Sequence, residues 1–220
     1  LLPLTLDGAV WYHAQVLAFA LTVGAICCLT LDRMTAALFL YALSVACRPF
    51  NALYAVPLFF VYLSVNRRQG VRLSDAVESL SPGVALGLLV AAALGLYNYV
   101  RFGDFFEFGH NYLPEFSFQG GTQFSLSHIA ANAKTFLFGL PLYTEGGAVK
   151  FKMFGYSAFL ACPMLMLMAV WFVADLIRKR MTREKIAVFA CFAVHLLLLL
   201  THRTFGGFQL GARYAVDVMP

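Results

Sequence analysis

Six long apolar runs constrain the fold of this chain more than any other feature. They cover residues 14–31, 34–47, 50–65, 83–100, 155–177 and 186–200. Because about 20 apolar residues cross the hydrocarbon core as a helix, the runs predict an all-α, polytopic transmembrane helix bundle of about six spans. Hydrophobic residues make up 61% of the sequence and charged residues 12%, a balance far from that of soluble domains. We therefore expect residues 1–220 to form a single integral membrane domain.

Two basic loops predict the orientation of the spans. They contain Arg67, Arg68 and Arg72 in one case and Arg178, Lys179, Arg180, Arg183 and Lys185 in the other. Lysine and arginine collect on the cytoplasmic side, so both loops are assigned to that side. Alternation then makes residues 101–154 a long, partly helical extracytoplasmic loop. Within it, apolar residues recur at helical spacing from Ser127 and stop at Pro141, which predicts an amphipathic interfacial helix.

A break is predicted inside residues 34–65. Read as one continuous helix, this stretch would be about 48 Å long and would carry Arg48 and Pro49 in mid-membrane. Proline fixes its own φ and disfavours helical backbone at the preceding residue, so we expect two helices separated at Arg48. Farther along the chain, Ser81 and Pro82 are expected to cap the start of the next span.

Three arginines lie at the ends of spans opposite to the two basic loops. They are Arg48, Arg101 and Arg213. Guanidinium groups suit bidentate contacts with phosphate oxygens, so the set predicts a site for an anion such as a lipid phosphate. Two simpler explanations stay open. An arginine at the end of a span can reach water by snorkelling, and neighbouring carboxylates such as Asp104 and Asp217 could pair with Arg101 and Arg213.

The sequence around Arg101 combines aromatic and polar side chains in the way that sugar sites do. The residues concerned are Asn98, Tyr99, Asp104, Glu107 and His110. Aromatic faces bind the C–H patches of a sugar ring, and carboxylates and amides bind its hydroxyls. An interfacial aromatic belt has a similar composition, so this alternative also stays open.

Several other classes of function lack support in the sequence. The histidines show no metal-ligand spacing with a carboxylate, and no phosphate-binding loop or hydrolase signature occurs. We therefore expect no metal and no cofactor. The net charge of +5 comes largely from the two loops and not from a basic stripe interleaved with aromatics, so we expect no nucleic-acid partner.

Three motifs occur in order along the chain. They are Ser-Val-Ala-Cys-Arg-Pro at 44–49, Asn-Tyr-Val-Arg-Phe-Gly-Asp at 98–104 with Glu-Phe-Gly at 107–109, and Gly-Gly-Phe at 206–208 with Gly-Ala-Arg-Tyr at 211–214. Together with the spacing of the spans, they resemble the polyprenyl-phosphate-sugar glycosyltransferases of the GT-C fold. The likeness is to the bacterial family 39 group related to protein O-mannosyltransferases, and it extends over essentially the whole chain.

The resemblance implies transfer of a sugar from a polyprenyl-phosphate-linked donor to an acceptor at the extracytoplasmic face of a bacterial plasma membrane. Arg48, Arg101 and Arg213 would neutralise the departing lipid phosphate, and Tyr214 would join the substrate-binding residues. In this family an aspartate of the first extracytoplasmic loop deprotonates the acceptor. That aspartate is expected upstream of Leu1, so the catalytic residue is unknown and the chain is expected to be a fragment.

A transporter or flippase of a lipid-linked or anionic solute is the alternative from another class. It predicts inverted repeats, helices broken at mid-membrane, or ionisable residues deep in several spans. Only His195 and Asp175 meet the last condition. A membrane scaffold without chemistry is a third possibility.

Overall fold

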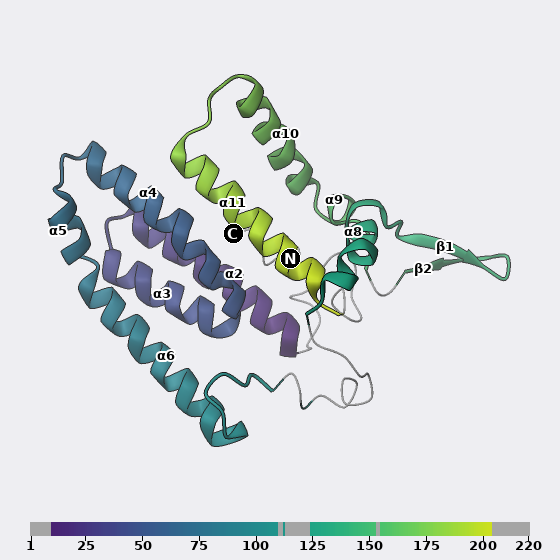
Figure 1. Ribbon diagram of the computed structural model, residues 1–220, viewed down its shortest axis with the longest axis horizontal. Coiled ribbons are helices and arrows are strands. Elements are labelled where there is room, and N and C mark those ends of the chain that lie inside the picture. Colours follow the sequence, from purple (N-terminus) through teal and green to yellow (C-terminus); the bar gives the residue numbers. More distant parts are fainter. Residues whose placement is uncertain (1–9, 110–111, 113–123, 153–154, 204–220) are drawn as a thin grey trace. The chain divides into compact units, whose positions relative to one another are not determined.

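The computed structural model describes residues 10–109, 112, 124–152 and 155–203 (Figure 1). The described chain is helical apart from one two-stranded sheet. It divides into two compact units, an N-terminal unit of Asp7–Gly121 and a C-terminal unit of Thr122–Pro220 together with Leu1–Leu6. The boundary falls inside the segment 101–154, which the sequence predicts to lie outside the membrane.

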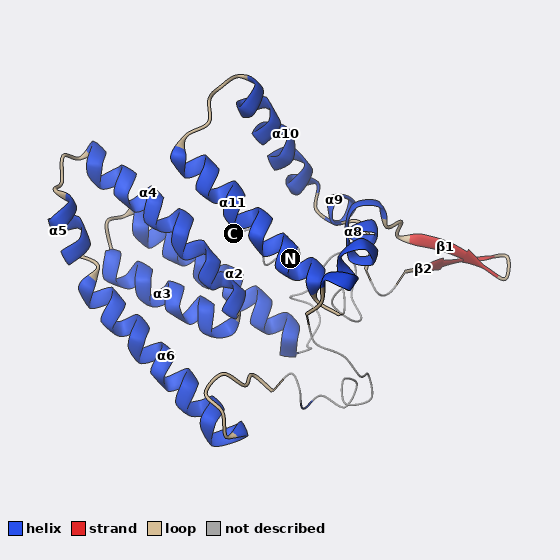
Figure 2. Cartoon of the chain, in the orientation of Figure 1, coloured by secondary structure: helices blue, strands red, loops and turns tan. Residues whose placement is uncertain are grey.

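The N-terminal unit is built from helices only. They are α2 (Val10–Thr30), α3 (Met34–Cys47), the 3-10 helix η1 (Pro49–Tyr54), α4 (Ala55–Arg68), α5 (Leu73–Glu78) and α6 (Ser81–Phe102). A three-residue turn joins α2 to α3, so these two helices run antiparallel, and α3 packs against both α2 and α6. Figure 2 shows α3 and α6 side by side.

Two glycines set the close packing of α6 on α3. A Cβ at Gly83 would lie 2.6 Å from Leu38 Cδ1 and 2.7 Å from Leu38 Cβ, and one at Gly87 would lie 3.6 Å from Ala42 Cβ. Small residues four apart let two helices approach closely, and this is a common way to pair helices in membranes. The two contacts share one offset along the sequence, so they define the register of α3 against α6.

The break predicted at Arg48 and Pro49 is confirmed. The α3 helix ends at Cys47, Arg48 has extended backbone (φ −142°, ψ 97°), and Pro49 starts η1. The prediction for the start of α6 is wrong in one respect. Ser81 is the first helical residue and does not cap the helix, because Leu80 occupies the N-cap position without a side-chain hydrogen bond. Pro82 lies in the first turn, where its missing N–H costs nothing.

The C-terminal unit contains the predicted helix of the long loop and two further apolar helices. Its elements are η3 (Leu126–His128), α8 (Ile129–Phe138), β1 (Leu142–Glu145), β2 (Ala148–Phe151), α9 (Ala158–Ala161), α10 (Pro163–Ile177) and α11 (Arg183–Thr201). Phe136, Ala158 and Leu165 form a buried cluster that joins α8, α9 and α10. The side chains of Phe192, Leu196 and Leu200 on α11 pack against this cluster.

The C-terminal end of α11 is capped by two residues of the preceding segment, Asn132 on α8 and Ser125 just before η3. Asn132 Nδ2 on α8 donates to the carbonyls of Leu200 (2.9 Å) and His202 (2.8 Å). The Ser125 N–H donates to Thr201 O at 2.8 Å. The last carbonyls of a helix have no partner within the helix, and these donors supply one. As a result, α8 is fixed at the C-terminal end of α11.

Four helical stretches in the described part of the chain are long and apolar enough to cross a membrane. They are Tyr12–Thr30, Pro49–Arg68, Leu73–Phe102 and Arg183–Thr201. Met34–Cys47 and Pro163–Ile177 are apolar but shorter. These helices are those of an integral membrane protein. The six spans and their orientation stay predictions.

Candidate functional site

Arg48 occupies the break between α3 and η1. Its N–H donates to Ser44 O at 2.9 Å, and its carbonyl accepts from the Asn51 N–H at 2.9 Å. The backbone therefore stays hydrogen-bonded on both sides of the extended residue, although the helix is interrupted. The side chain of Arg48 is half-buried.

A group of buried polar side chains fixes this break against α2. Thr22, Ser44 and Asn51, which we call the polar clasp, are all at most 2% exposed. The hydroxyl oxygens of Thr22 and Ser44 lie 2.6 Å apart, so one hydroxyl donates to the other. The hydroxyl that accepts this bond can donate to Ala18 O, which lies 2.9 Å from Thr22 Oγ1 and 3.0 Å from Ser44 Oγ. Asn51 Nδ2 donates to Ser44 Oγ at 2.7 Å. Buried polar groups are costly unless they are hydrogen-bonded, so the clasp holds α2, α3 and η1 in one arrangement.

Arg48 is recessed within the N-terminal unit. The α3–α6 register places the end of α3 level with the middle of α6, so Arg101 lies about two turns, or roughly 12 Å, farther along the axis than Arg48. The contact between Thr22 and Ser44 indicates the same depth for Arg48. Thr22, which meets Ser44, lies about 18 Å from Val10, and Arg48 lies only about 6 Å beyond Ser44. The two arginines thus differ in depth, and the break does not reach the level of the α6 exit.

Arg101 lies in the last turn of α6 and is held by aromatic neighbours. Its Nη1 donates to the Tyr97 hydroxyl at 2.8 Å, and its guanidinium carbon lies 4.9 Å from the centre of the Phe102 ring. The helix ends at Gly103, whose φ of 77° is left-handed and whose N–H donates to Tyr99 O at 2.8 Å. Such a residue is the usual end of a helix and favours glycine. The exposed guanidinium is thus oriented by local contacts.

The other residues predicted around Arg101 form the turn that follows α6. Asn98 is 3% exposed, and its Nδ2 donates to Phe105 O at 3.2 Å. Tyr99 is half-exposed and stacks on the Phe105 ring with 4.8 Å between centres. The carboxylates of Asp104 and Glu107 accept from the backbone N–H groups two residues on, at 2.8 and 2.7 Å. Within the described chain, Arg101 forms no ion pair with Asp104.

The structure therefore brings only part of the predicted site together. Asn98, Tyr99, Arg101, Asp104 and Glu107 share the α6 exit, and Arg48 lies deeper in the same unit. Three further predicted residues, His110, Arg213 and Tyr214, lie outside the described residues. Among the described residues, no group of three or more His, Cys, Asp or Glu is placed to hold a metal ion.

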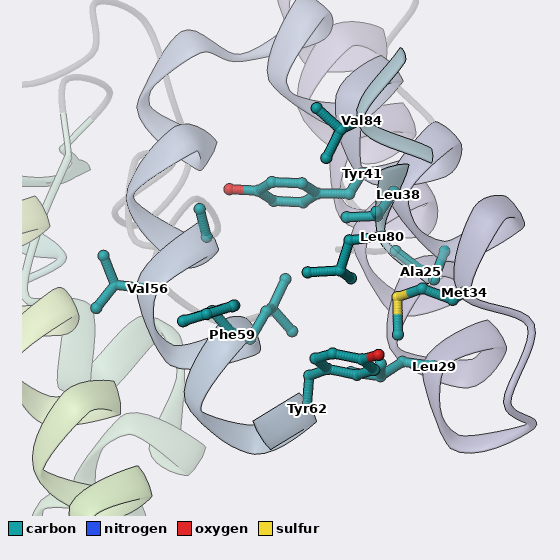
Figure 3. A pocket seen from close by; sticks show the side chains of 13 residues that line it. Ala25, Leu29, Met34, Leu38, Tyr41, Val56, Phe59, Tyr62, Leu80 and Val84 are labelled. Carbon is teal, nitrogen blue, oxygen red and sulfur yellow. The ribbon is translucent and has the colours of Figure 1, made fainter. Parts of the chain in front are cut away.

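Two apolar cavities lie along α3, on the N-terminal side of Arg48. One has a volume of about 430 Å³ and is lined by α2, α3, α4 and the start of α6. Figure 3 shows that the hydroxyls of Tyr41 and Tyr62 are the only polar atoms on its labelled side chains. The other, of about 360 Å³, extends along α3 and α6 as far as Ala46 and Ala52, on either side of the break. No charged residue lines either cavity. An apolar chain would fit them better than a polar ligand.

The polar clasp was missed in the sequence. Thr22 and Ser44 lie within apolar runs, where a hydroxyl can bond to a carbonyl of its own helix without functional meaning. Their partnership with each other and with Asn51 depends on the packing of α2 on α3. The available signal was one polar residue in the middle of the first apolar run, one near the end of the second and one at the start of the third.

Comparison with known proteins gives no relative for this arrangement. The chain matches no protein-family model, no curated protein and no solved structure.

Proposed function

We propose that this chain binds a polyprenyl-phosphate-linked sugar and takes part in transfer of that sugar to an acceptor at the extracytoplasmic face of a bacterial plasma membrane. The observation that carries the proposal is an uncharged, apolar cavity that extends to Ala46 and Ala52, on either side of the break at which Arg48 lies. A fixed cation beside an apolar channel is suited to an amphiphile whose head is an anion.

The order of the features along α3 and α6 supports the same ligand. The apolar cavities come first, Arg48 follows at the break, and the aromatic and polar α6 exit lies roughly 12 Å farther along. A polyprenyl-phosphate sugar has its parts in this order: an apolar chain, a phosphate and a polar ring. Tyr99 at this exit is half-exposed, and one face of its ring stacks on Phe105.

The clasp fixes the backbone from which the Arg48 side chain extends. In the proposed reaction the lipid phosphate departs as negative charge grows on its oxygens, and a guanidinium already in place stabilises that charge without reorganisation. Asn51 Oδ1 in this clasp is buried, and no donor among the described residues reaches it. The group that deprotonates the acceptor is not assigned.

The test uses the full-length protein in lipid nanodiscs with a radiolabelled polyprenyl-phosphate sugar. We expect Arg48→Gln to weaken binding of the lipid, and Arg67→Gln, at the far end of α4, to leave binding unchanged. Sugar transfer to acceptor should be lost with binding. Unchanged affinity of the Arg48 variant would remove the basis of the proposal. Movement of the labelled lipid across a liposome membrane, without transfer to any acceptor, would favour the flippase alternative.

A further inference from the structure

The hairpin formed by β1 and β2 has two chemically different faces. Leu142 pairs with Phe151 and Thr144 with Val149, so these four side chains share one face, which we call the apolar face. The opposite face carries Tyr143, Glu145, Ala148 and Lys150, with a salt bridge of 2.8 Å between Lys150 Nζ and Glu145 Oε2. Positive φ at both turn residues, Gly146 and Gly147, matches the turn that suits the twist of a two-residue hairpin.

The apolar face is largely uncovered within the C-terminal unit, where only its Phe151 ring contacts another aromatic ring, that of Tyr156, among the described residues. Val149 is 69% exposed, Leu142 52% and Phe151 42%. Figure 2 shows the two strands projecting past α8 and α9, away from α10 and α11. An isolated two-stranded hairpin is at best marginally stable in water, and three or more strands or a covering surface are normally needed. The alternation of the side chains is therefore explained if something apolar covers one face.

The base of the hairpin is fixed at the end of two apolar helices. The Lys152 N–H donates to Pro141 O at 2.8 Å, and Ser157 bonds to the end of α8 through Gly139 O (2.9 Å) and Leu137 O (3.0 Å). The α8 helix itself caps the C-terminal end of α11 through Asn132. Since α11 is long and apolar enough to cross a membrane, its end marks the edge of the bilayer. The hairpin thus begins at that edge.

The exposed surface next to the hairpin is apolar as well. Phe138 is 74% exposed and Leu140 is 68% exposed, and both precede β1 directly. Residues 124–152 contain three lysines, at 134, 150 and 152, against the single carboxylate of Glu145. An apolar surface bordered by positive charge is characteristic of segments that lie at a membrane interface, where acyl chains cover the apolar side and anionic headgroups attract the lysines.

We propose that the apolar face of the hairpin inserts into the lipid surface beside α11, so that the hairpin lies on the membrane with Lys150 and Glu145 facing water. The occupant is lipid, because the apolar face continues the apolar surface of α8 at the end of a membrane helix. This contact does not depend on sugar transfer.

Two neighbouring residues provide a matched pair of probes. Val149 and Ala148 are adjacent on β2 and lie on opposite faces. In a chain with both native tryptophans replaced, Trp11→Phe and Trp171→Phe, either Val149→Trp or Ala148→Trp is introduced. Each variant is placed in nanodiscs of phosphatidylcholine and phosphatidylglycerol, with lipids brominated near the headgroup end of the acyl chain. Quenching by bromine reports lipid contact, and quenching by aqueous iodide reports exposure to water. Circular dichroism verifies that both variants keep the helical content of the parent.

We expect the Val149→Trp emission to be shifted to shorter wavelength, quenched by brominated lipid and protected from iodide. The Ala148→Trp emission should show the reverse. Equal quenching of both probes by iodide would overturn the proposal, because the hairpin would then stand in water. Protection of the Val149→Trp probe from both quenchers would also overturn it, because protein and not lipid would cover the face. Bromine quenching of both probes would contradict the two-faced arrangement.

Discussion

Arg48 and Arg101 each mark the end of a helix in the N-terminal unit, but the two ends are fixed by different kinds of contact. The end of α3 is held by the polar clasp, whose members come from three separate elements and are almost fully buried. The end of α6 is held by residues within one short stretch, through Tyr97, Gly103 and Phe105. A long-range buried network can fix a charge below the surface, whereas local contacts suffice where water reaches the side chain.

The largest expected difference between the two ends concerns ligand affinity. Charge-assisted hydrogen bonds contribute about 1.5–3 kcal/mol, so Arg48→Gln should weaken binding of polyprenyl phosphate roughly 10- to 100-fold. Arg101→Gln should have a smaller effect, because that guanidinium is exposed and screened. Isothermal titration in nanodiscs measures both, and Arg48→Lys separates charge from guanidinium geometry. Equal losses at the two positions would mean that depth does not distinguish them.

Removal of the central hydroxyl tests whether the clasp stabilises the break. Ser44→Ala leaves Asn51 Nδ2 and the Thr22 hydroxyl with one partner fewer, at a cost of about 1–3 kcal/mol in the free energy of unfolding. The control is Thr30→Ala, since Thr30 bonds only to Cys27 O at the exposed end of α2. Thermal unfolding in detergent gives the difference. If the two variants melt together, the clasp is not what fixes the break.

The register of α3 against α6 sets the difference in depth and can be perturbed directly. Gly83→Ala would place a methyl group 2.6 Å from Leu38 Cδ1, and overpacking of this kind costs about 1–3 kcal/mol. Gly87→Ala, one turn away, meets Ala42 at an ordinary 3.6 Å and should be neutral or stabilising, because alanine favours helix over glycine. Denaturant or thermal unfolding compares the pair. A destabilised Gly87 variant would show that the register differs from the one described.

The smallest effect is expected where α6 ends. Gly103→Ala forces a side chain into left-handed backbone at φ 77° and should cost about 1–2 kcal/mol. Gly70→Ala meets the same strain at φ 74° after α4, so its loss of stability should be similar. Only the Gly103 variant should also lower the affinity for the lipid-linked sugar, because it displaces Tyr99 and Arg101. A matching fall in affinity for Gly70→Ala would argue against a ligand at the α6 exit.

The features that were predicted correctly from the sequence are determined by neighbouring residues, and features determined by packing were not predicted. The break at Pro49 and the helix that stops before Pro141 follow from local backbone chemistry, and both were predicted. The depth of Arg48 depends on the contact between Gly83 and Leu38, which hydropathy does not reveal. The pairing of Asp104 with Arg101, which the sequence left open, does not form, because the Asp104 carboxylate accepts from the backbone of its own turn.

The hairpin was missed although a local signal was present. Two glycines at 146 and 147 separate short stretches that alternate in polarity, which is a typical hairpin pattern. The strands were not predicted because the interpretation of residues 101–154 followed helical spacing and aromatic content. A four-residue strand is too short to stand out against these features.

The cap on α11 also imposes an order on biosynthesis. Asn132 precedes its two acceptors, Leu200 and His202, by 68 and 70 residues. During translation α8 leaves the ribosome well before α11 does. The Asn132 side-chain amide therefore has no bond to these carbonyls until α11 has been synthesised. The contact between α8 and α11 can form only after α11 has been synthesised and inserted. A nascent chain arrested before residue 200 should therefore expose α8 to protease, and release of the arrest should protect it.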